Sequence, residues 1–393
     1  MRTSYPVILS CLLILALLVS CSTPGLVGGA AEKDLDTIEG PAATEDTGGI
    51  TFTPPQPPPP PPRPPFHQSE PFTPTYPGSG AGIPVPALPG VPPYGYPAME
   101  FIEFMNDNLY ARTPFSYREL EAALWIVGQL LYMGYTQEDI EVQPFSWYNV
   151  YEWRMFSWEL MEIVGVLSAE TTRQGRLSQN VILTVPGQSE QVIVVGAHYD
   201  SHPYPGASDN ASGVALLLES ALRMLHHDNY YTIVYVFFGA EEAGILGAYY
   251  YLNSLSEEQR DAVSFMVNAD VLLEGPYLLY AAGYDREGYP QASAITRRVD
   301  AIAADLLEHY GIAVNALPEG IFWETDHIPF LEAGHTVVVF AGLYLDPDGF
   351  FQPRILHTYR DCIHYINQTW PGKAPRAMQA YSFFLERILL DAS

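Results

Sequence analysis

The chain has 393 residues, and its 45 aspartate and glutamate residues against 18 lysine and arginine residues give a formal net charge of −27. Such a negative field repels phosphate, which argues against nucleic acid and anionic lipid headgroups as partners. Hydrophobic residues make up 48% of the sequence, enough to form the core of one large α/β domain or two small ones.

The first twenty residues have the features of an export signal. Arg2 precedes an apolar run, residues 7–18, that is too short to span a bilayer. The run leads into Leu18-Val19-Ser20-Cys21, which resembles the bacterial lipoprotein box, in which the cysteine is lipidated after cleavage. We therefore expect residues 1–20 to be a lipoprotein signal peptide and Cys21 to anchor the protein to a membrane, facing outside the cytoplasm. An ordinary signal peptide with a chance cysteine is the alternative.

Residues 21–98 are expected to form a proline-rich linker without fixed structure. Its unbroken proline run, Pro57–Pro62, favours an extended polyproline II conformation, which acts as a semi-rigid spacer. A docking site for a proline-reading partner is the alternative. The remaining residues, 99–393, form the predicted folded body. Cys362 is the one cysteine of that body, so no internal disulfide framework is expected.

The body begins with a helix signal and continues with alternating strand-like and helical segments. Ser116-Tyr-Arg-Glu119 is a capping-box pattern, and the helix that it starts is expected to end at Gly134. The other expected elements are strands at 161–167, 180–185, 192–195, 233–238, 263–267 and 336–340, and helices at 213–225 and 301–310. This alternation predicts an α/β fold with a largely parallel sheet and helices on both faces.

Side chains suited to metal binding and acid–base chemistry follow three of these expected strands. His198 comes after the strand at 192–195, Glu241 and Glu242 after the strand at 233–238, and Asp270 after the strand at 263–267. In open α/β sheets, ligands bind beyond the carboxyl ends of the strands. We therefore expect these side chains to converge in space although they are scattered in sequence.

Their neighbours make a chemical role plausible, and each also has a structural alternative. Asp200 could accept the second ring N–H of His198 and fix its tautomer. Asp209 precedes the predicted helix at 213–225, where a carboxylate can bridge two cations or simply cap the helix. Adjacent Glu241 and Glu242 repel one another near a core unless a cation or a proton offsets their charge, whereas an exposed loop would relieve the repulsion. If both are buried, one can bind metal while the other takes a proton from water.

In order and spacing, these motifs resemble those of the M28 family of zinc peptidases, which includes bacterial aminopeptidases. The resemblance runs from the helix at Ser116 to the C-terminal region, and it is specific only for the motifs taken together. The motifs are Gly196-Ala-His-Tyr-Asp-Ser201, Ser208-Asp-Asn-Ala-Ser-Gly213, Gly239-Ala-Glu-Glu-Ala-Gly244, Asn268-Ala-Asp270, Thr325-Asp-His-Ile-Pro-Phe330 and His357-Thr-Tyr-Arg-Asp361. It implies a mixed, mostly parallel central sheet between helices, in agreement with the alternation of elements.

The resemblance also implies two zinc ions and a role for each motif residue. The implied roles are His198 and Asp270 on one ion, Glu242 and His357 on the other, Asp209 bridging both, Glu241 as general base, and Asp200 as the residue that orients His198. Imidazoles and carboxylates suit Zn²⁺, with Co²⁺ or Mn²⁺ as substitutes. His364 also lies in the terminal region, but the family's spacing selects His357 and leaves His364 on a helix surface.

The resulting hypothesis is a dizinc aminopeptidase that removes N-terminal residues from peptides. One alternative is a glutaminyl cyclase of the same superfamily, which Asp326-His-Ile-Pro-Phe-Leu331 resembles. Ser208-Asp-Asn-Ala-Ser-Gly213 and Leu356, where cyclases usually have Trp, argue against it. The other alternative is a non-catalytic surface binding protein on a peptidase scaffold, although such scaffolds typically lose ligands that are all present here. No feature of the sequence indicates the oligomeric state or the preferred substrate residue. Phe322, Trp323 and Tyr284 are candidate pocket walls or core residues.

Overall fold

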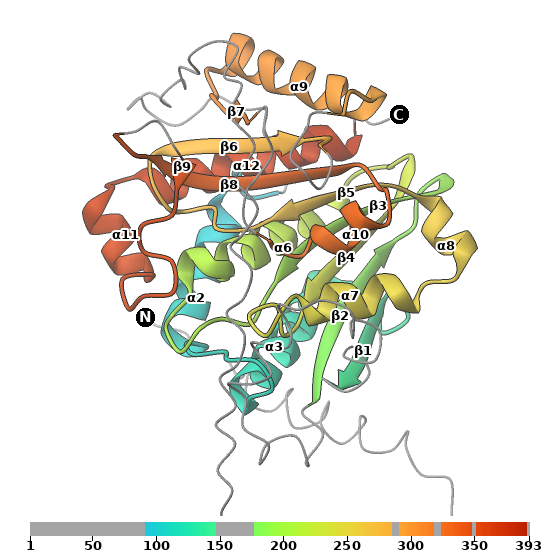
Figure 1. Ribbon diagram of the computed structural model, residues 1–393, viewed down its shortest axis with the longest axis horizontal. Coiled ribbons are helices and arrows are strands. Elements are labelled where there is room, and N and C mark those ends of the chain that lie inside the picture. The colour runs from blue at the N-terminus through green and yellow to red at the C-terminus, as the bar shows by residue number, and fades with distance from the viewer. Residues whose placement is uncertain (1–90, 147–176, 285–290, 318–323, 348–350, 391–393) are drawn as a thin grey trace, which may run out of the picture. The chain divides into compact units, whose positions relative to one another are not determined.

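A mixed β-sheet forms the centre of the described structure (Figure 1). The computed structural model describes residues 91–146, 177–284, 291–317, 324–347 and 351–390. The strands among these residues are β1 (Ile140–Ser146), β2 (Leu177–Val185), β3 (Ser189–His198), β4 (Tyr231–Phe238), β5 (Val263–Ala269), β6 (Tyr277–Ala282), β7 (Asn315–Ala316), β8 (Val337–Leu345) and β9 (Phe351–Gln352). Their order across the sheet is β1-β2-β4-β3-β5-β8-β6-β7, with β9 paired to β8.

The parallel strands lie in the middle of the sheet. Neighbours β4, β3, β5 and β8 all pair in parallel, as do β6 and β7. Antiparallel pairs flank them, β1 with β2 and β2 with β4 on one side, and β6 and β9 with β8 on the other. The predicted mixed sheet with a parallel centre is therefore confirmed.

Helices cover both faces of this sheet. The helices among the described residues are α2 (Tyr96–Asn108), α3 (Tyr117–Met133), α6 (Ser212–Met224), α7 (Leu246–Ser254), α8 (Glu257–Ala262), α9 (Ala294–Tyr310), α10 (Ile328–Glu332), α11 (Ile363–Thr369) and α12 (Lys373–Leu390). Helices α2, α3 and α12 pack on α6, which lies against β3, while α10 packs on α7 against the opposite face (Figure 1). None of the described helices is both long and apolar enough to cross a bilayer.

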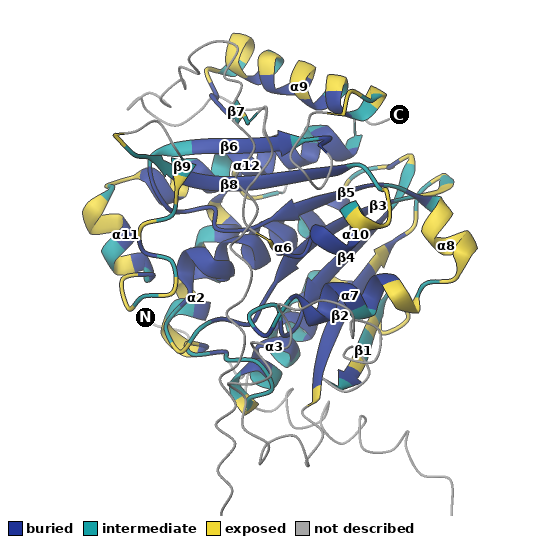
Figure 2. Cartoon of the chain, in the orientation of Figure 1, coloured by how far each residue is buried: buried dark blue, intermediate teal, exposed yellow. Residues whose placement is uncertain are grey.

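The continuous apolar character of the central strands follows from this double cover. In β3, Ile193 and Val195 belong to the apolar cluster that contains α6, whereas Val194 belongs to the cluster that contains α7 and α10. Successive strand residues point to opposite faces, so a strand covered on both sides needs an apolar residue at every position. Figure 2 shows the central strands buried along most of their length.

Most of the expected elements are present, with some changes at their ends. The helix predicted from Ser116 to Gly134 is α3, because the Ser116 hydroxyl accepts from the Glu119 N–H and Gly134 ends the helix in the left-handed conformation. The helix predicted from residue 301 begins earlier, at Ala294, since Ser293 caps it. The strand expected at 161–167 lies outside the described residues.

A buried glutamate of α6 holds the start of α2 and also forms an ion pair within α6. Glu219 is fully buried, and its carboxylate accepts hydrogen bonds from the backbone N–H groups of Gly95 at 2.8 Å and Ala98 at 3.1 Å. The same carboxylate pairs with Arg223, whose Nη2 lies 2.8 Å away. One side chain therefore fixes the start of α2 on the helix that covers β3.

Replacing Glu219 with Ala is expected to lower the free energy of unfolding by ~3–5 kcal/mol, because the Arg223 guanidinium would lose its buried partner. Urea denaturation of the full chain measures the change. Glu219→Gln keeps an acceptor and most of the volume and should cost less, and the exposed Glu138→Ala should stay within ~0.5 kcal/mol of the unsubstituted protein. Equal stability of Glu219→Ala and Glu138→Ala would contradict this account.

Candidate active site

Three parallel strands end at one edge of the sheet and bring polar side chains together there. β3 ends at His198, β4 ends at Phe238 shortly before Glu241, and β5 ends just before Asp270. Nε2 of His198 lies 3.3 Å from Oδ1 of Asp270. The convergence expected from the strand ends is thus present in the structure.

Asp209 lies between two imidazoles. Its Oδ1 is 3.2 Å from Nε2 of His198, and its Oδ2 is 3.2 Å from Nε2 of His357. His357 Nε2 is also 3.2 Å from Oε2 of Glu242. Through its two oxygens, one carboxylate contacts both groups of residues.

A network of hydrogen bonds fixes the turn that carries Asp209, η1 (Ala207–Ala211). The carboxylate of Asp361 accepts from the N–H groups of Ser208 at 2.7 Å and Asp209 at 3.0 Å. Burial raises the pKa of Asp361 to about 8. A glycine follows at position 213, where an added Cβ would lie 2.3 Å from the carbonyl oxygen of Ala269. The start of α6 therefore packs directly against the end of β5.

Two buried carboxylates hold the loop that carries Glu241 and Glu242. Asp200 accepts from the N–H of Glu241 at 3.0 Å and from that of Glu242 at 3.1 Å. Glu119 accepts from the N–H of Ala240 at 3.0 Å. Nδ1 of His198 lies 3.2 Å from the Asp200 carbonyl oxygen and 3.6 Å from its Oδ1. Asp200 therefore contacts His198 and also ties the ends of β3 and β4 together.

Carboxylates greatly outnumber cationic side chains at this edge of the sheet. Among the residues that the structure describes, no lysine or arginine forms an ion pair with Asp200, Asp209, Glu241, Glu242, Asp270 or Asp326. Burial raises the pKa of Glu241 and of Asp326 well above the usual range, and neighbouring acids add to the effect. Uncompensated negative charge of this density requires protons or cations.

Positive charge is most favoured on the half-exposed side of the site, beside Glu242 and His357. Burial opposes ionisation of Glu242, but hydrogen bonds with His202 and His357 outweigh it and lower the pKa of Glu242 to about 2. Hydrogen bonds with Asp209 and Glu242 raise the pKa of His357 to about 10. A bound cation would take the place of the His357 proton.

The arrangement fits metal ions. Three groups of side chains bring ligand atoms within 4.8 Å of one another, namely His198-Asp209-Asp270, His202-Glu242-His357 and His198-Glu241-Glu242. In a tetrahedral zinc site with bonds of ~2.0–2.1 Å, ligand atoms are about 3.3 Å apart. The His198 and His357 contacts with Asp209, Asp270 and Glu242 are 3.2–3.3 Å. Imidazole and carboxylate donors suit Zn²⁺.

Two further residues shape the site from a distance, and the sequence did not reveal them. Arg112 is fully buried and donates to the carbonyl oxygens of Tyr199 at 2.7 Å and Pro205 at 2.9 Å, which sets the course of the loop after β3. Glu274 accepts from the N–H groups of Arg354 and Ile355, in the segment that leads to His357. Neither residue belongs to a recognisable motif, because both act on backbone groups far away in sequence.

Other histidines and pocket candidates lie elsewhere. His364 is exposed on α11, as expected. His327 is fully buried, and its ring centroid lies 6.0 Å from that of buried Tyr284. The other two pocket candidates, Phe322 and Trp323, lie outside the described residues.

Fold and sequence together place this chain among proteins with a zinc aminopeptidase-like α/β fold. Residues 180–382 match the family described as Peptidase family M28. The chain belongs to this family. Aminopeptidase YwaD of Bacillus subtilis (strain 168) is 32% identical over 182 residues, which make up 45% of this chain and 37% of that protein. The chain thus spans little more than a third of that relative's length.

Two solved structures illustrate how far the fold is shared. BSAP, a zinc aminopeptidase from Bacillus subtilis, matches with a TM-score of 0.57 at 19% identity, over 75% of this chain and 95% of that one. A glutaminyl cyclase from Porphyromonas gingivalis matches with a TM-score of 0.55 at 19% identity, over 76% of this chain and 98% of that one. The nearly equal likenesses mean that the fold does not separate the two activities.

Proposed function

We propose that this protein hydrolyses peptide bonds with a pair of zinc ions and removes N-terminal residues from peptides. The observation that carries the proposal is the Asp209 carboxylate, whose two oxygens each lie 3.2 Å from the Nε2 of a different histidine. A carboxylate placed in this way is suited to bridge two ions. Membership of the M28 family supports the same conclusion.

Each ion would have its own set of protein ligands. His198 and Asp270 would hold one ion with Oδ1 of Asp209, and His357 and Glu242 would hold the other with Oδ2. Bound zinc supplies Lewis acidity, which lowers the pKa of water and polarises a peptide carbonyl. Co²⁺ or Mn²⁺ could bind to the same ligands as substitutes for Zn²⁺.

Glu241 would be the general base. It lies beside the ligand groups of His198 and Glu242, and it is not needed as a ligand in either set. Burial and the nearby acids raise the pKa of Glu241 well above the usual range, which makes its carboxylate a stronger base. In this role its carboxylate accepts a proton from water and returns it to the leaving amine. Asp200 holds the Glu241 N–H and so positions the base.

Charge favours an aminopeptidase over a carboxypeptidase. No lysine or arginine among the described residues pairs with the acids of the site, and although two zinc ions would offset much of the charge of the ligand carboxylates, the whole chain has a formal net charge of −27. A free N-terminal ammonium group is attracted to such a site, whereas a C-terminal carboxylate is repelled. Peptides with a free N-terminus are therefore the proposed substrates.

Glutaminyl cyclase activity is a second candidate, favoured by one specific observation. Asp326 and His327 are both fully buried within the motif that resembles the cyclase branch. The similarity to the Porphyromonas gingivalis enzyme, at a TM-score of 0.55, is consistent with this candidate. An N-terminal glutamine substrate separates it from the peptidase.

The proposed setting of the enzyme rests on the sequence alone. Residues 1–20 would be a lipoprotein signal peptide, Cys21 would carry the lipid anchor, and a linker would lead from there to the peptidase domain. The linker ends earlier than the expected boundary at residue 98, because helix α2 begins at Tyr96 and Ala98 is buried. The protein would then act outside the cytoplasm on peptides that reach the membrane surface.

Mass spectrometry of peptides incubated with the zinc-loaded full chain tests the function. We expect stepwise loss of N-terminal residues from free peptides, no cleavage of the same peptides after N-acetylation, and no cleavage with a chelator. Loss of ammonia alone from an N-terminal glutamine peptide would identify a cyclase, and shortening from the C-terminus would identify a carboxypeptidase. A protein that neither binds metal nor changes any peptide would be a binding scaffold.

A further inference from the structure

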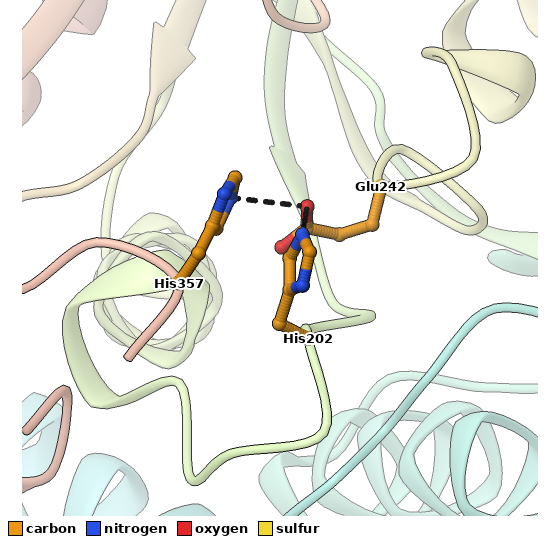
Figure 3. Close-up of side chains that lie close together, drawn as sticks. All are labelled: His202, Glu242 and His357. Carbon is orange, nitrogen blue, oxygen red and sulfur yellow. Dashed lines mark ion pairs between the residues drawn. The ribbon is translucent and has the colours of Figure 1, made fainter. Parts of the chain in front are cut away.

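A third imidazole reaches the half-exposed group of ligands. Nε2 of His202 lies 3.1 Å from Oε2 of Glu242, the same oxygen that lies 3.2 Å from Nε2 of His357. Figure 3 shows the two histidines approaching this carboxylate from different loops. Their rings are stacked, with centroids 3.8 Å apart and an angle of 30° between the planes. His202 has no part in the ligand set inferred from the sequence.

We propose that His202 is an additional protein ligand, through Nε2, of the metal ion held by Glu242, His357 and Asp209. This inference rests on the proposed two-ion function and adds a residue to one of its sites. It makes the two sites chemically different, with one imidazole at the first ion and two at the second.

The contact of His202 with Glu242 has the length expected between two ligands of one ion, and it is the one carboxylate contact of His202 among the described residues. Its 3.1 Å contact with Glu242 falls beside the 3.2–3.3 Å contacts of His198 and His357, and near the ~3.3 Å expected between two ligand atoms of a tetrahedral zinc ion. Glu242, His357 and Asp209 would provide three ligands and Nε2 of His202 a fourth, so water or substrate would take a fifth position on this ion. The ligand atoms of His202, Glu242 and His357 lie within 4.8 Å of one another.

The backbone around His202 is already fixed in a position suited to this role. The N–H of Ser201 donates to the carbonyl oxygen of Arg112 at 3.1 Å, and the N–H of Tyr204 donates to that of His202 at 2.6 Å. Pro203 follows directly and restricts the backbone of His202. A preorganised ligand loses little conformational freedom when it binds, which increases affinity.

The two metal sites differ in solvent exposure, and an additional ligand would matter most at the more exposed one. The side chain of His198 is 1% exposed, whereas those of His202 and His357 are 41% and 44% exposed. An ion at the second site therefore lies open to solvent, where ligand exchange is easier. Another imidazole would strengthen its hold and favour Zn²⁺ over Mn²⁺, because imidazole suits Zn²⁺ and oxygen ligands suit Mn²⁺.

Chelator competition with the full chain tests the assignment. In His202→Ala, the more weakly held zinc ion is expected to bind at least ~10–100-fold more weakly, because the loss of a ligand costs no less than the loss of a residue that positions one, while the tightly held ion is unchanged. The preference of the weaker site for Zn²⁺ over Mn²⁺ should fall as well. The exposed His364→Ala is the matched control and should bind both ions normally. Thermal unfolding of the metal-free variants verifies that they fold.

X-ray absorption at the zinc edge gives a readout independent of activity. The unsubstituted chain should show three imidazoles shared between two ions, and His202→Ala should show two. His202→Gln can still donate a hydrogen bond to Glu242 but is a poor zinc ligand, so it should resemble His202→Ala. Full affinity in His202→Gln would mean that His202 only hydrogen-bonds to Glu242, and would overturn the proposal.

The two proposals fail in different ways. If the unsubstituted chain binds no zinc, the proposed function fails. If it binds two ions and cleaves peptides, but His202→Ala keeps the same affinities and the same imidazole count, only the role of His202 fails.

Discussion

Replacing Glu241 with Gln is expected to reduce kcat by ~10²–10⁴-fold while both zinc ions stay bound. Glutamine has nearly the same shape as glutamate but cannot take a proton from water. The ligands Glu242, His198 and Asp209 are unchanged in this variant, so metal content should not fall. Steady-state kinetics on a cleavable peptide, with metal content measured on the same sample, give both quantities.

The adjacent acid provides the sharpest control for this experiment. Glu242→Gln removes a proposed ligand, so it should lower metal content as well as turnover. Glu141 is exposed on β1, so Glu141→Gln should change neither metal content nor turnover. Normal turnover by a metal-loaded Glu241→Gln variant would show that another group is the base.

Replacing Asp209 with Ala is expected to weaken binding at both metal sites and to abolish activity. This carboxylate is the one that contacts His198 and His357 through separate oxygens, so its loss affects both ligand sets. Zinc should then no longer raise the melting temperature, because the stabilisation from a ligand that binds only the folded state, RT ln(1 + [L]/Kd), vanishes when the affinity is lost. Calorimetric titration and thermal unfolding with and without zinc measure the two effects.

Two other variants define what the bridge contributes. Asp209→Asn retains one carbonyl oxygen as a donor, so it is expected to bind no more than one ion tightly. Asp261→Ala removes an exposed acid and should leave both affinities unchanged. Two tightly bound ions in Asp209→Ala would rule out a bridging role for this residue.

The parts of the fold that could be predicted are those for which burial leaves a local pattern. Residues 192–195 and 233–238 are apolar throughout because both faces of the central strands are covered, and they lie in β3 and β4 as expected. The end of each strand then places the following polar residue. For this reason the positions of His198, Glu241 and Asp270 at one edge of the sheet could be predicted from the sequence.

The supporting residues could not be predicted in the same way. Glu119 fits a local capping pattern, yet its carboxylate accepts from Phe115, Ser178 and Ala240 rather than from the N–H of Ser116. The position of His202 depends on the course of the loop that Arg112 holds through its carbonyl contacts. Contacts of a side chain with distant backbone leave no spacing or periodicity that a single sequence can show.

The buried arginine and glutamate near the start of the folded region limit how far the chain can be shortened. Arg112 and Glu119 precede residue 180, where the family match begins, yet they hold the loops that carry His202 and Glu241. A gene fragment cut at the family boundary would encode every proposed metal ligand and still lack the residues that shape their loops. Deletions from the amino end should thus be tolerated only if they leave Gly95, which Glu219 holds, and all residues after it in place.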